Sequence, residues 1–392
     1  MDTHHPLPLL AGLSPEQFMR RHWQKKPLLV RQAVPGIKPF LSRSELCKLA
    51  SREGVESRLI VQSPAGWRMK NGPFAPRSLP ALDKAVWTLL VQGVDAHNAQ
   101  ANALLGQFRF VPDARLDDLM ISFATPGGGV GPHFDSYDVF LLQASGRRCW
   151  KISQQKDLTL QPDVPLKILQ NFQPEQEFVL DAGDMLYLPP RYAHDGVAQA
   201  ALGLDGKATE CMTYSIGFKA PAQRDLAAEL LHRLAEFGED AAQNEQLRGG
   251  PVLYRDPAQA ATATPAALPA AMMTFATDAV MAALKDPLAI ACALGEVMTE
   301  LKPSVWFDET TAAWQPPTND AGIALDAKCR MMYGTDHIFI NGESHRAKGA
   351  DARLLQRLAD QRGLSGLELR RASSAALELL ADWHAAGWIH GA

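Results

Sequence analysis

The chain has 392 residues, of which 46% are hydrophobic and 21% are charged, ordinary values for a globular protein of two or three domains. Its formal net charge of -4 gives no sign of nucleic-acid binding through charge. The five cysteines are odd in number and show no C-x-x-C spacing, which argues against a disulfide framework and favours a reducing compartment.

The first residues, MDTHHPLPLL, lack a basic region followed by a long apolar run. No stretch of 18 or more apolar residues occurs in the sequence, so no membrane-spanning helix is predicted. We therefore expect a cytoplasmic protein with no membrane partner.

The N-terminal part is predicted to mix short helices and strands. Ser14, Pro15 and Gln17 form the capping pattern of a helix, and a strand is expected at 28–31. A second helix is expected to open at Ser42 or Ser44 and to run to residue 50. Segments 58–62 and 67–70 predict a hairpin, and the apolar spacing within 83–94 predicts a further helix.

Residues 117–220 show the patterns of β-structure. Five strand-like runs are separated by Gly, Pro and Asp, in the order DDLMISFAT, the run through His133, QASGRRCWKIS, QEFVLDAGDMLYLPP and CMTYSIGF. Short strands without intervening helices indicate a sandwich or barrel. We predict an α+β protein whose main part is a double-stranded β-helix of the cupin or jelly-roll kind.

The remainder of the chain has two further patterns. Residues 221–300 predict a small helical module with a linker at 258–271 and a helix break at Asp286-Pro287. Its apolar stripes would pack internally or across a dimer interface. Segments 330–333 and 337–341 predict two strands, followed by helices at 351–361 and about 373–386. This order resembles a winged helix, although a small α/β cap without a binding role has the same pattern.

A metal site is predicted around the segment PGGGVGPHFDSYDVF at 126–140. His133 and Asp135 lie at i and i+2 in a segment predicted to be a strand, where alternate side chains share a face. His194, in LDAGDMLYLPPRYAHDG, would complete a 2-His-1-carboxylate triad, which holds non-haem Fe(II) and leaves positions open for substrate. His194 as a surface residue is the alternative, and Asp195 is expected to support the site or face solvent.

Other catalytic motifs are absent from the sequence. The glycine run at 127–131 does not form G-x-G-x-x-G at the start of a helix, and neither G-x-x-x-x-G-K-[ST] nor G-x-S-x-G occurs. Nucleotide binding and serine hydrolase chemistry are therefore not supported.

Four segments carry a resemblance to a known family, the bacterial JmjC-domain ribosomal oxygenases. These segments are RHWQKKPLLVR at 21–31, DDLMISFATPGGGVGPHFDSYDVFLLQASGRRCW at 117–150, GDMLYLPPRYAHDG at 183–196 and YSIGFKAP at 214–221. The resemblance implies an Fe(II)- and 2-oxoglutarate-dependent oxygenase that hydroxylates an arginine side-chain carbon of large-subunit ribosomal protein sixteen. O2 is the second co-substrate, and succinate and CO2 are the products.

The co-substrate needs an anchor for its far carboxylate, and Arg148 is our candidate. It lies fifteen residues beyond His133, on the next predicted strand, and a guanidinium can bind a carboxylate through two hydrogen bonds. The family resemblance implies a basic anchor at this place, and a salt bridge at the rim is the alternative. Arg147 should face the other side of the strand. Ser122 is expected to donate a hydroxyl to the same co-substrate.

An arginine substrate needs acceptors that fix its guanidinium while a carbon is attacked. The resemblance implies Asp118, Tyr137 and Ser215 as substrate-binding residues, with core packing as the alternative for Tyr137.

The resemblance also implies three domains in a homodimer: a JmjC catalytic domain at 1–220, a helical dimerisation domain at 221–300 and a winged-helix-like domain at 301–392. Two alternatives remain. The first is a histidine-directed hydroxylase or a lysine demethylase on the same barrel. The second is a non-catalytic regulatory protein whose winged helix binds nucleic acid, a partner that the overall charge does not favour.

Overall fold

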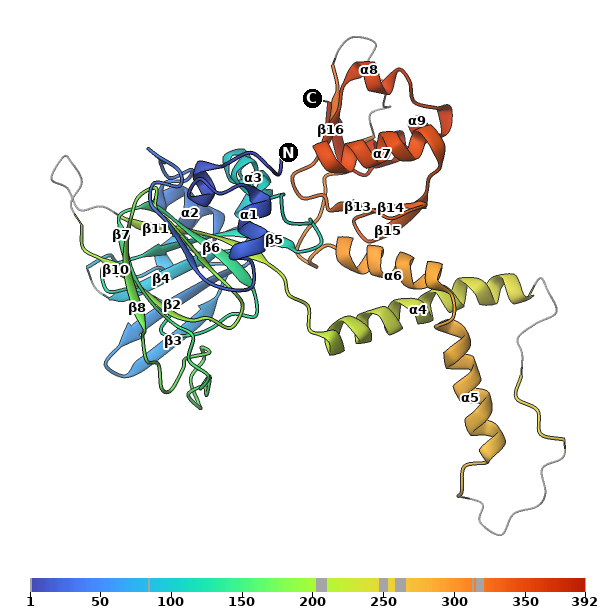
Figure 1. Ribbon diagram of the computed structural model, residues 1–392, viewed down its shortest axis with the longest axis horizontal. Coiled ribbons are helices and arrows are strands. Elements are labelled where there is room, and N and C mark those ends of the chain that lie inside the picture. The colour runs from blue at the N-terminus through green and yellow to red at the C-terminus, as the bar shows by residue number, and fades with distance from the viewer. Residues whose placement is uncertain are drawn as a thin grey trace. The chain divides into compact units, whose positions relative to one another are not determined.

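The computed structural model describes residues 2–83, 85–201, 210–246, 253–257, 266–311, 314 and 321–391. Two compact units make up the chain, Met1–Ala220 with Pro303–Trp306, and Pro221–Lys302 with Phe307–Ala392 (Figure 1). No helix in these described ranges is long and apolar enough to cross a membrane.

The first unit is built on two antiparallel sheets. Its strands are β1 (Leu28–Val30), β2 (Ser57–Ser63), β3 (Gly66–Asn71), β4 (Val86–Val91), β5 (Leu116–Ala124), β6 (Asp138–Ser145), β7 (Arg147–Ser153), β8 (Gln176–Asp181), β9 (Met185–Leu188), β10 (Ala193–Gln199) and β11 (Cys211–Phe218). The larger sheet has the order β1-β9-β6-β11-β5-β4-β2-β3, and the smaller has the order β10-β7-β8. The predicted double-stranded β-helix is confirmed.

Alternation along β6 separates the two faces of the larger sheet. Leu141 packs with Trp150 of the smaller sheet, so this face of β6 is turned towards that sheet. Phe140 points the other way, and its ring centroid lies 5.4 Å from that of Phe18 in α1 (Pro15–Arg21). The N-terminal helices therefore cover the outer face, and the inner face is left for the site.

The two N-terminal helices begin where the sequence predicts. Ser14 and Gln17 form a complete capping box at the start of α1. Ser42 and Glu45 form another at the start of α2 (Arg43–Leu49). The hairpin prediction is also confirmed, because β2 pairs with β3 from Arg58–Asn71 to Ser63–Gly66.

The helix predicted at 83–94 is wrong. This segment forms β4, which pairs with β2 on one side and β5 on the other. Residues 87–91 are all buried, so the strand needs apolar residues on both faces, and such a run also satisfies helical spacing. The helix α3 (Ala99–Gly106) follows and was not predicted.

The ligand segment around His133 differs from the predicted strand. His133 makes only an isolated bridge to His194, and β6 begins later, at Asp138. A long strand would hold the segment in a sheet on both sides, whereas a single bridge fixes the His133 backbone and lets the chain turn towards β6.

The second unit contains three long helices and a small α/β fold. The helices are α4 (Gln223–Gln246), α5 (Ala270–Ala283) and α6 (Pro287–Thr299), and the predicted break at Asp286-Pro287 is confirmed. The other elements are β12 (Ile323–Leu325), β13 (Met331–Tyr333), β14 (His337–Ile340), β15 (Glu343–Arg346), α7 (Gly349–Gln361), β16 (Gly363–Leu364), α8 (Gly366–Leu369), α9 (Ser374–Ala385) and β17 (Ile389–Gly391).

The last part of this unit confirms the predicted strand pair and the two helices that follow. β13 and β14 pair in a sheet with β15, and α7 and α9 follow them in the chain. Helix α6 packs on β14 and β15. Most of the linker predicted at 258–271 lies outside the described residues. The division at residues 220 and 300 stays a prediction.

Candidate metal centre and its cavity

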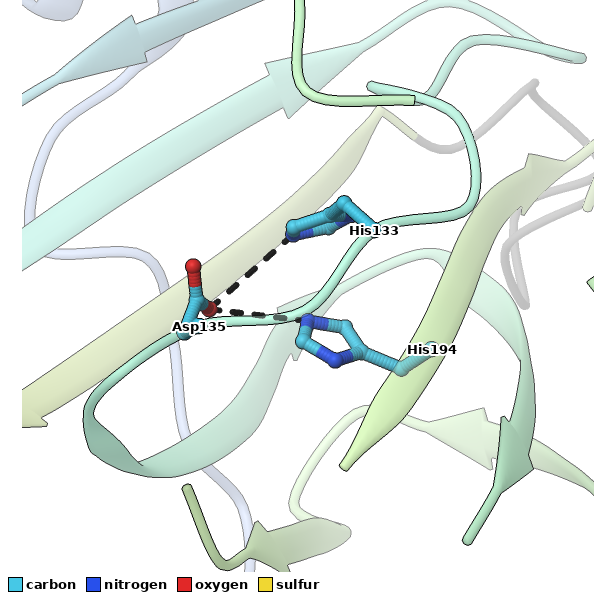
Figure 2. A group of neighbouring side chains, drawn as sticks. All are labelled: His133, Asp135 and His194. Atoms are coloured by element: carbon cyan, nitrogen blue, oxygen red, sulfur yellow. Dashed lines mark ion pairs between the residues drawn. The ribbon is translucent and has the colours of Figure 1, made fainter. Parts of the chain in front are cut away.

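Three side chains converge in the first unit, His133 and Asp135 from the loop before β6 and His194 from β10. Their ligand atoms all lie within 4.8 Å of one another, the one such group found among the described residues. The Asp135 Oδ2 atom is 4.0 Å from His133 Nε2 and 3.7 Å from His194 Nε2 (Figure 2). This spacing leaves room for a cation between the three donors.

Both imidazoles are held in the same way. The Nδ1 atom of His133 lies 2.8 Å from the Gly131 carbonyl oxygen, and that of His194 lies 2.9 Å from the Tyr192 carbonyl oxygen. A carbonyl accepts only, so each Nδ1 carries a proton, and in the neutral ring each Nε2 has a free lone pair. Both rings therefore present Nε2 to Asp135 as a metal ligand would.

The backbone holds the two histidines in register. His133 and His194 exchange both backbone hydrogen bonds, at 2.9 and 2.8 Å, and the Arg191 N–H donates to the Asp135 carbonyl at 2.7 Å. Gly131 has a φ of +78°, which is strained for other residues. Its carbonyl orients the His133 ring, so the glycine-rich turn is part of the site.

The electrostatics of His194 suit a neutral ligand. Burial, together with the neighbouring His133, lowers the pKa of His194 to about 4, although Asp135 acts in the opposite direction. The ring is therefore unprotonated at neutral pH, and its lone pair is available to a cation without loss of a proton.

A cavity of about 500 Å³ opens beside the three ligands. Every site residue predicted from the sequence lines it, namely Asp118, Ser122, His133, Asp135, Tyr137, Arg148, His194 and Ser215. Their common location does not test the role predicted for each. The three metal ligands, the Arg148 guanidinium and the carboxylates of Asp117 and Asp118 therefore share one cavity. This cavity is large enough for a small acid and a side chain.

Arg148 is buried, with 3% of its surface exposed, and projects into the cavity from β7. Its Nη1 donates to the Gly196 carbonyl at 3.1 Å, whereas Nε and Nη2 are buried without a partner. A guanidinium without enough acceptors is costly in such a place. An anion in the cavity would supply the missing acceptors.

The neighbouring Arg147 has different surroundings. Its Nε donates to the Asp181 carboxylate at 2.7 Å, and both side chains are about half exposed, at 46% and 55%. The predicted opposite orientation of the two arginines is confirmed, because one lines the cavity and the other makes a surface ion pair.

Gly196 connects the anion anchor to the metal ligands. It lies two residues after His194 on β10, and a Cβ atom there would meet the Trp150 ring at 2.4 Å. The Trp150 ring lies 5.8 Å from that of His194 and 5.7 Å from the Arg148 guanidinium carbon. A glycine is required because the tryptophan fills the space that a side chain would take.

Hydroxyl groups line the cavity along neighbouring strands. Ser122 Oγ donates to the Thr213 carbonyl at 3.3 Å. The Thr213 hydroxyl donates to Gln143 Oε1 at 2.8 Å, which leaves the Thr213 oxygen free to accept. Both hydroxyls are therefore oriented by the sheet.

The carboxylates lie at the start of β5. Asp118 is buried and accepts the Gly93 N–H at 2.9 Å, and Asp117 forms an ion pair with Lys219 at 3.2 Å. Ser215 lies on the adjacent strand β11. Tyr137 is 38% exposed, so the alternative that its side chain packs in the core is wrong. Tyr137 lies at the rim of the cavity.

Sequence reasoning missed several residues that line the cavity, among them Arg58, Gln92, Asp117, Trp150 and Thr213. Arg58 lies on β2 and Gln92 directly follows β4, both outside the segments that carried the family resemblance. Their place becomes visible only when the sheet order joins β2 and β4 to β5. Thr213 could have been found from the alternation in CMTYSIGF, where it shares a face with Ser215.

The donor set fits a non-haem iron centre. Two imidazoles and one carboxylate are ligands that Fe(II) accepts, and three protein donors would leave coordination positions open for a co-substrate and O2. The buried and under-satisfied Arg148 fits the far carboxylate of a 2-oxo acid.

Comparisons with known proteins agree with this site and fold. Residues 103–226 match the family model of the JmjC domain, and residues 282–390 match that of the ROXA-like winged helix. The chain therefore carries a JmjC domain and a C-terminal winged helix. The winged-helix match begins at 282 and includes α6, before the boundary predicted at 301.

Two curated relatives are ribosomal oxygenases by description. The chain is 39% identical over 212 residues to "Ribosomal protein uL16 3-hydroxylase" of Escherichia coli K12, which is 53% of each protein. It is 34% identical over 216 residues to "Probable ribosomal oxygenase" of Haemophilus influenzae Rd, which is 53% of this chain and 50% of the relative. The alignments thus span about half the length of these relatives.

A solved structure extends the similarity along the chain. YcfD, described as a ribosomal oxygenase from Escherichia coli in complex with cobalt and 2-oxoglutarate, has a TM-score of 0.76 at 28% identity. The match covers 97% of this chain and 98% of that one.

Proposed function

We propose that this chain, which carries a JmjC domain and resembles the ribosomal oxygenases, is an Fe(II)- and 2-oxoglutarate-dependent oxygenase of a ribosomal protein. One observation carries the proposal. The donor triad and the buried, under-satisfied Arg148 line the same cavity, which is the combination that a metal-bound 2-oxo acid requires. The complex of the similar YcfD with cobalt and 2-oxoglutarate supports it.

In this proposal His133, Asp135 and His194 hold the iron, with both histidines binding through Nε2. When bound, Fe(II) supplies the coupled oxidation in which O2 converts 2-oxoglutarate to succinate and CO2 and a substrate C–H becomes C–OH. The protein keeps His194 neutral through burial and fixes both rings through the Gly131 and Tyr192 carbonyls.

Arg148 and Ser122 bind the co-substrate in this proposal. The Nε and Nη2 groups of Arg148, which have no protein acceptor, donate to the far carboxylate of 2-oxoglutarate. Ser122 can add a hydroxyl from β5 by turning away from the Thr213 carbonyl. The pair sets the length of acid that the cavity accepts, because the other end must reach the metal ligands.

The substrate is proposed to be an arginine side chain. Asp118 supplies a carboxylate for its guanidinium, Ser215 supplies a hydroxyl, and Tyr137 at the rim supports the aliphatic part. The description of the Escherichia coli relative as a uL16 hydroxylase makes uL16 the first substrate to test. A ribosomal substrate also implies action in the cytoplasm.

A homodimer is proposed for the helical segment. Five apolar side chains of α5 are each more than a third exposed, namely Met272, Met273, Phe275, Val280 and Met281. So much apolar surface on one helix is unfavourable in water. Burial against a second copy of the chain would remove this apolar surface from water. Analytical ultracentrifugation of the whole chain tests this, with a dimer expected at micromolar concentration.

The test of the proposed function is a reaction with recombinant uL16, read by mass spectrometry of the substrate. Complete mixtures are expected to give a shift of +16 Da on arginine, and omission of Fe(II) or 2-oxoglutarate should remove it. An Asp118→Asn variant should raise the KM for uL16 about tenfold, since a charge-assisted hydrogen bond is lost.

The alternatives have distinct outcomes in the same experiment. A shift of +16 Da on histidine would indicate a histidine-directed hydroxylase, and loss of 14 Da from a methylated lysine would indicate a demethylase. No consumption of 2-oxoglutarate with any protein would favour a regulatory binding protein.

A further inference from the structure

The inner face of the larger sheet carries a second arginine that the proposed reaction does not use. Arg58 lies on β2 and lines the cavity with Ile60 of the same strand and Met69 of β3. Among the described residues its guanidinium has no hydrogen bond or ion pair, and its Nε is buried without a partner. Arg58 is thus an unpaired cation at the wall of the proposed active site.

The residues around Arg58 give its positive charge no structural role. Glu56 lies two residues earlier on the same face, but its carboxylate is contacted by the side-chain amide of Gln92 and makes no ion pair with Arg58 in the described part of the chain. Ile60, Met69 and Leu90 are the apolar neighbours on the cavity wall. An aliphatic residue would fit this wall at less cost in desolvation.

Strand pairing places Arg58 at a distance from the co-substrate site. Arg58 pairs with Leu90, which pairs with Ser122, so two strand spacings separate Arg58 from the serine. That is about 10 Å between backbones. The pairs Leu90–Ser122 and Ser122–Thr213 continue towards β11. Arg58 is therefore at the β2–β3 side of the cavity, and Asp117 and Asp118 are at the start of β5.

We propose that Arg58 is a specificity-determining residue that binds an oxygen acceptor of the substrate chain outside the target side chain. This inference rests on the proposed function, because it assumes a peptide in the cavity. A cavity with carboxylates at one place and an unpaired guanidinium at another would bind two features of one substrate and fix its direction. The acceptor is either an acidic side chain or a backbone carbonyl next to the target residue.

The two sources of the acceptor predict different responses. A carboxylate would make substrates with Asp or Glu at one position preferred, and Glu→Gln in the peptide would remove the preference. A backbone carbonyl would bind Arg58 whatever side chain is present, so only changes at Arg58 would matter.

The matched control is Arg68 on β3, in the same hairpin. Arg68 pairs with Val61, is exposed and does not line the cavity. We expect Arg58→Gln to lower kcat/KM for uL16 about tenfold to hundredfold, the loss of a charge-assisted hydrogen bond. Arg68→Gln should change it less than twofold. The Tm of Arg58→Gln should equal or exceed that of the wild type, because Arg58 has no partner to lose.

The closing experiment measures binding without turnover. Zn(II)-loaded full-length protein is titrated with arginine-centred peptides whose flanking positions are varied one at a time, for wild type, Arg58→Gln and Arg68→Gln. The expected result is weaker binding by Arg58→Gln alone, with an unchanged affinity for 2-oxoglutarate in all three proteins. A carboxylate partner appears as a lost preference at one position, and a carbonyl partner as a uniform loss.

The outcomes separate this inference from the proposed function. If wild type selects arginine and Arg58→Gln binds as tightly as wild type, the role of Arg58 is overturned and the proposed function stands. If peptides bind through Arg58 without selection of arginine at the centre, Arg58 keeps its role and the arginine substrate is wrong. A weakened affinity for 2-oxoglutarate in Arg58→Gln would assign Arg58 to the co-substrate instead, and absence of peptide binding would overturn both.

Discussion

The two halves of the chain differ in charge as well as in fold. Residues 1–220 contain 24 Lys and Arg against 21 Asp and Glu, whereas residues 221–392 contain 15 against 22. The first half carries the converging triad and the cavity. The second half carries a winged helix, matched at 282–390, that contains 11 Lys and Arg against 14 Asp and Glu. It has no excess of positive charge to favour contact with a phosphate backbone. A winged-helix fold alone is therefore not evidence of nucleic-acid binding here.

The largest expected effect comes from the metal ligands of the first half. His133→Ala or Asp135→Ala should lower turnover at least about a thousandfold, because a donor of the metal is lost. The iron content of each variant should fall together with its turnover. Inductively coupled plasma emission spectroscopy after gel filtration measures this content.

The second half offers a matched control. Glu343 and His345 are also two residues apart, with 3.5 Å between Glu343 Oε2 and His345 Nε2, but no third donor was found with them in the described ranges. Glu343→Ala should leave turnover and iron content unchanged. Loss of iron from this variant would contradict the assignment of the metal to the first half.

A smaller effect separates the two neighbouring arginines of β7. Arg148→Ala should raise the KM for 2-oxoglutarate about a hundredfold, since a buried charged hydrogen-bond donor is removed. Arg147→Ala should change it less than twofold, because the ion pair with Asp181 is at the surface. Succinate formation at varied 2-oxoglutarate concentrations gives both values. Equal effects of the two substitutions would mean that burial does not identify the anchor.

The winged helix gives a modest effect that depends on pH. Hydrogen bonds from Arg357 and from Ser365 hold the pKa of Glu368 at about 2. Since this pKa is below the ordinary value, the contribution favours folding above about pH 4.5 and disappears as pH falls towards 2. Glu368→Gln should reduce the free energy of unfolding by less than about 1 kcal/mol at pH 7, as the pair with Arg357 is partly exposed.

Urea unfolding at pH 7, 5 and 4 measures the difference in free energy of unfolding between the wild type and Glu368→Gln. This difference should be smallest at pH 4. A difference that grows as pH falls would show that the sign of this contribution is wrong.

The smallest expected effect is the absence of a nucleic-acid contact. A labelled DNA duplex titrated with the whole chain should show no binding tighter than about 100 µM at physiological salt. Arg370→Glu with Arg371→Glu should change nothing. Salt-sensitive DNA binding that this double variant abolishes would show that the winged helix binds nucleic acid. It would favour the alternative of a regulatory protein.

The sequence predicted the parts of the fold that have local causes. The capping box at Ser14, a helix start at Ser42 or Ser44, the hairpin β2–β3 and the break at Pro287 depend on neighbours in the chain and were predicted. The strand β4 was mistaken for a helix because its burial on both faces comes from β2 and β5, which are distant in sequence.

The candidate site shows the same division. His133 and Asp135 were recognised by their spacing, but no long strand holds them. A single bridge to His194 holds His133, and the Arg191 N–H holds the Asp135 carbonyl. The sequence could not show that Arg148 has two unpaired donors or that Arg58 faces the same cavity. Both facts require the order of the strands, which no local pattern encodes.

The central claim is that one cavity couples 2-oxoglutarate to the oxidation of a ribosomal-protein arginine. The most direct measurement is the ratio of succinate formed to hydroxylated arginine in uL16, in one reaction with Fe(II) and O2. The proposed function predicts a ratio close to one for the wild type and no hydroxyarginine without 2-oxoglutarate. Succinate formation that uL16 does not stimulate, with no hydroxylated arginine, would contradict it.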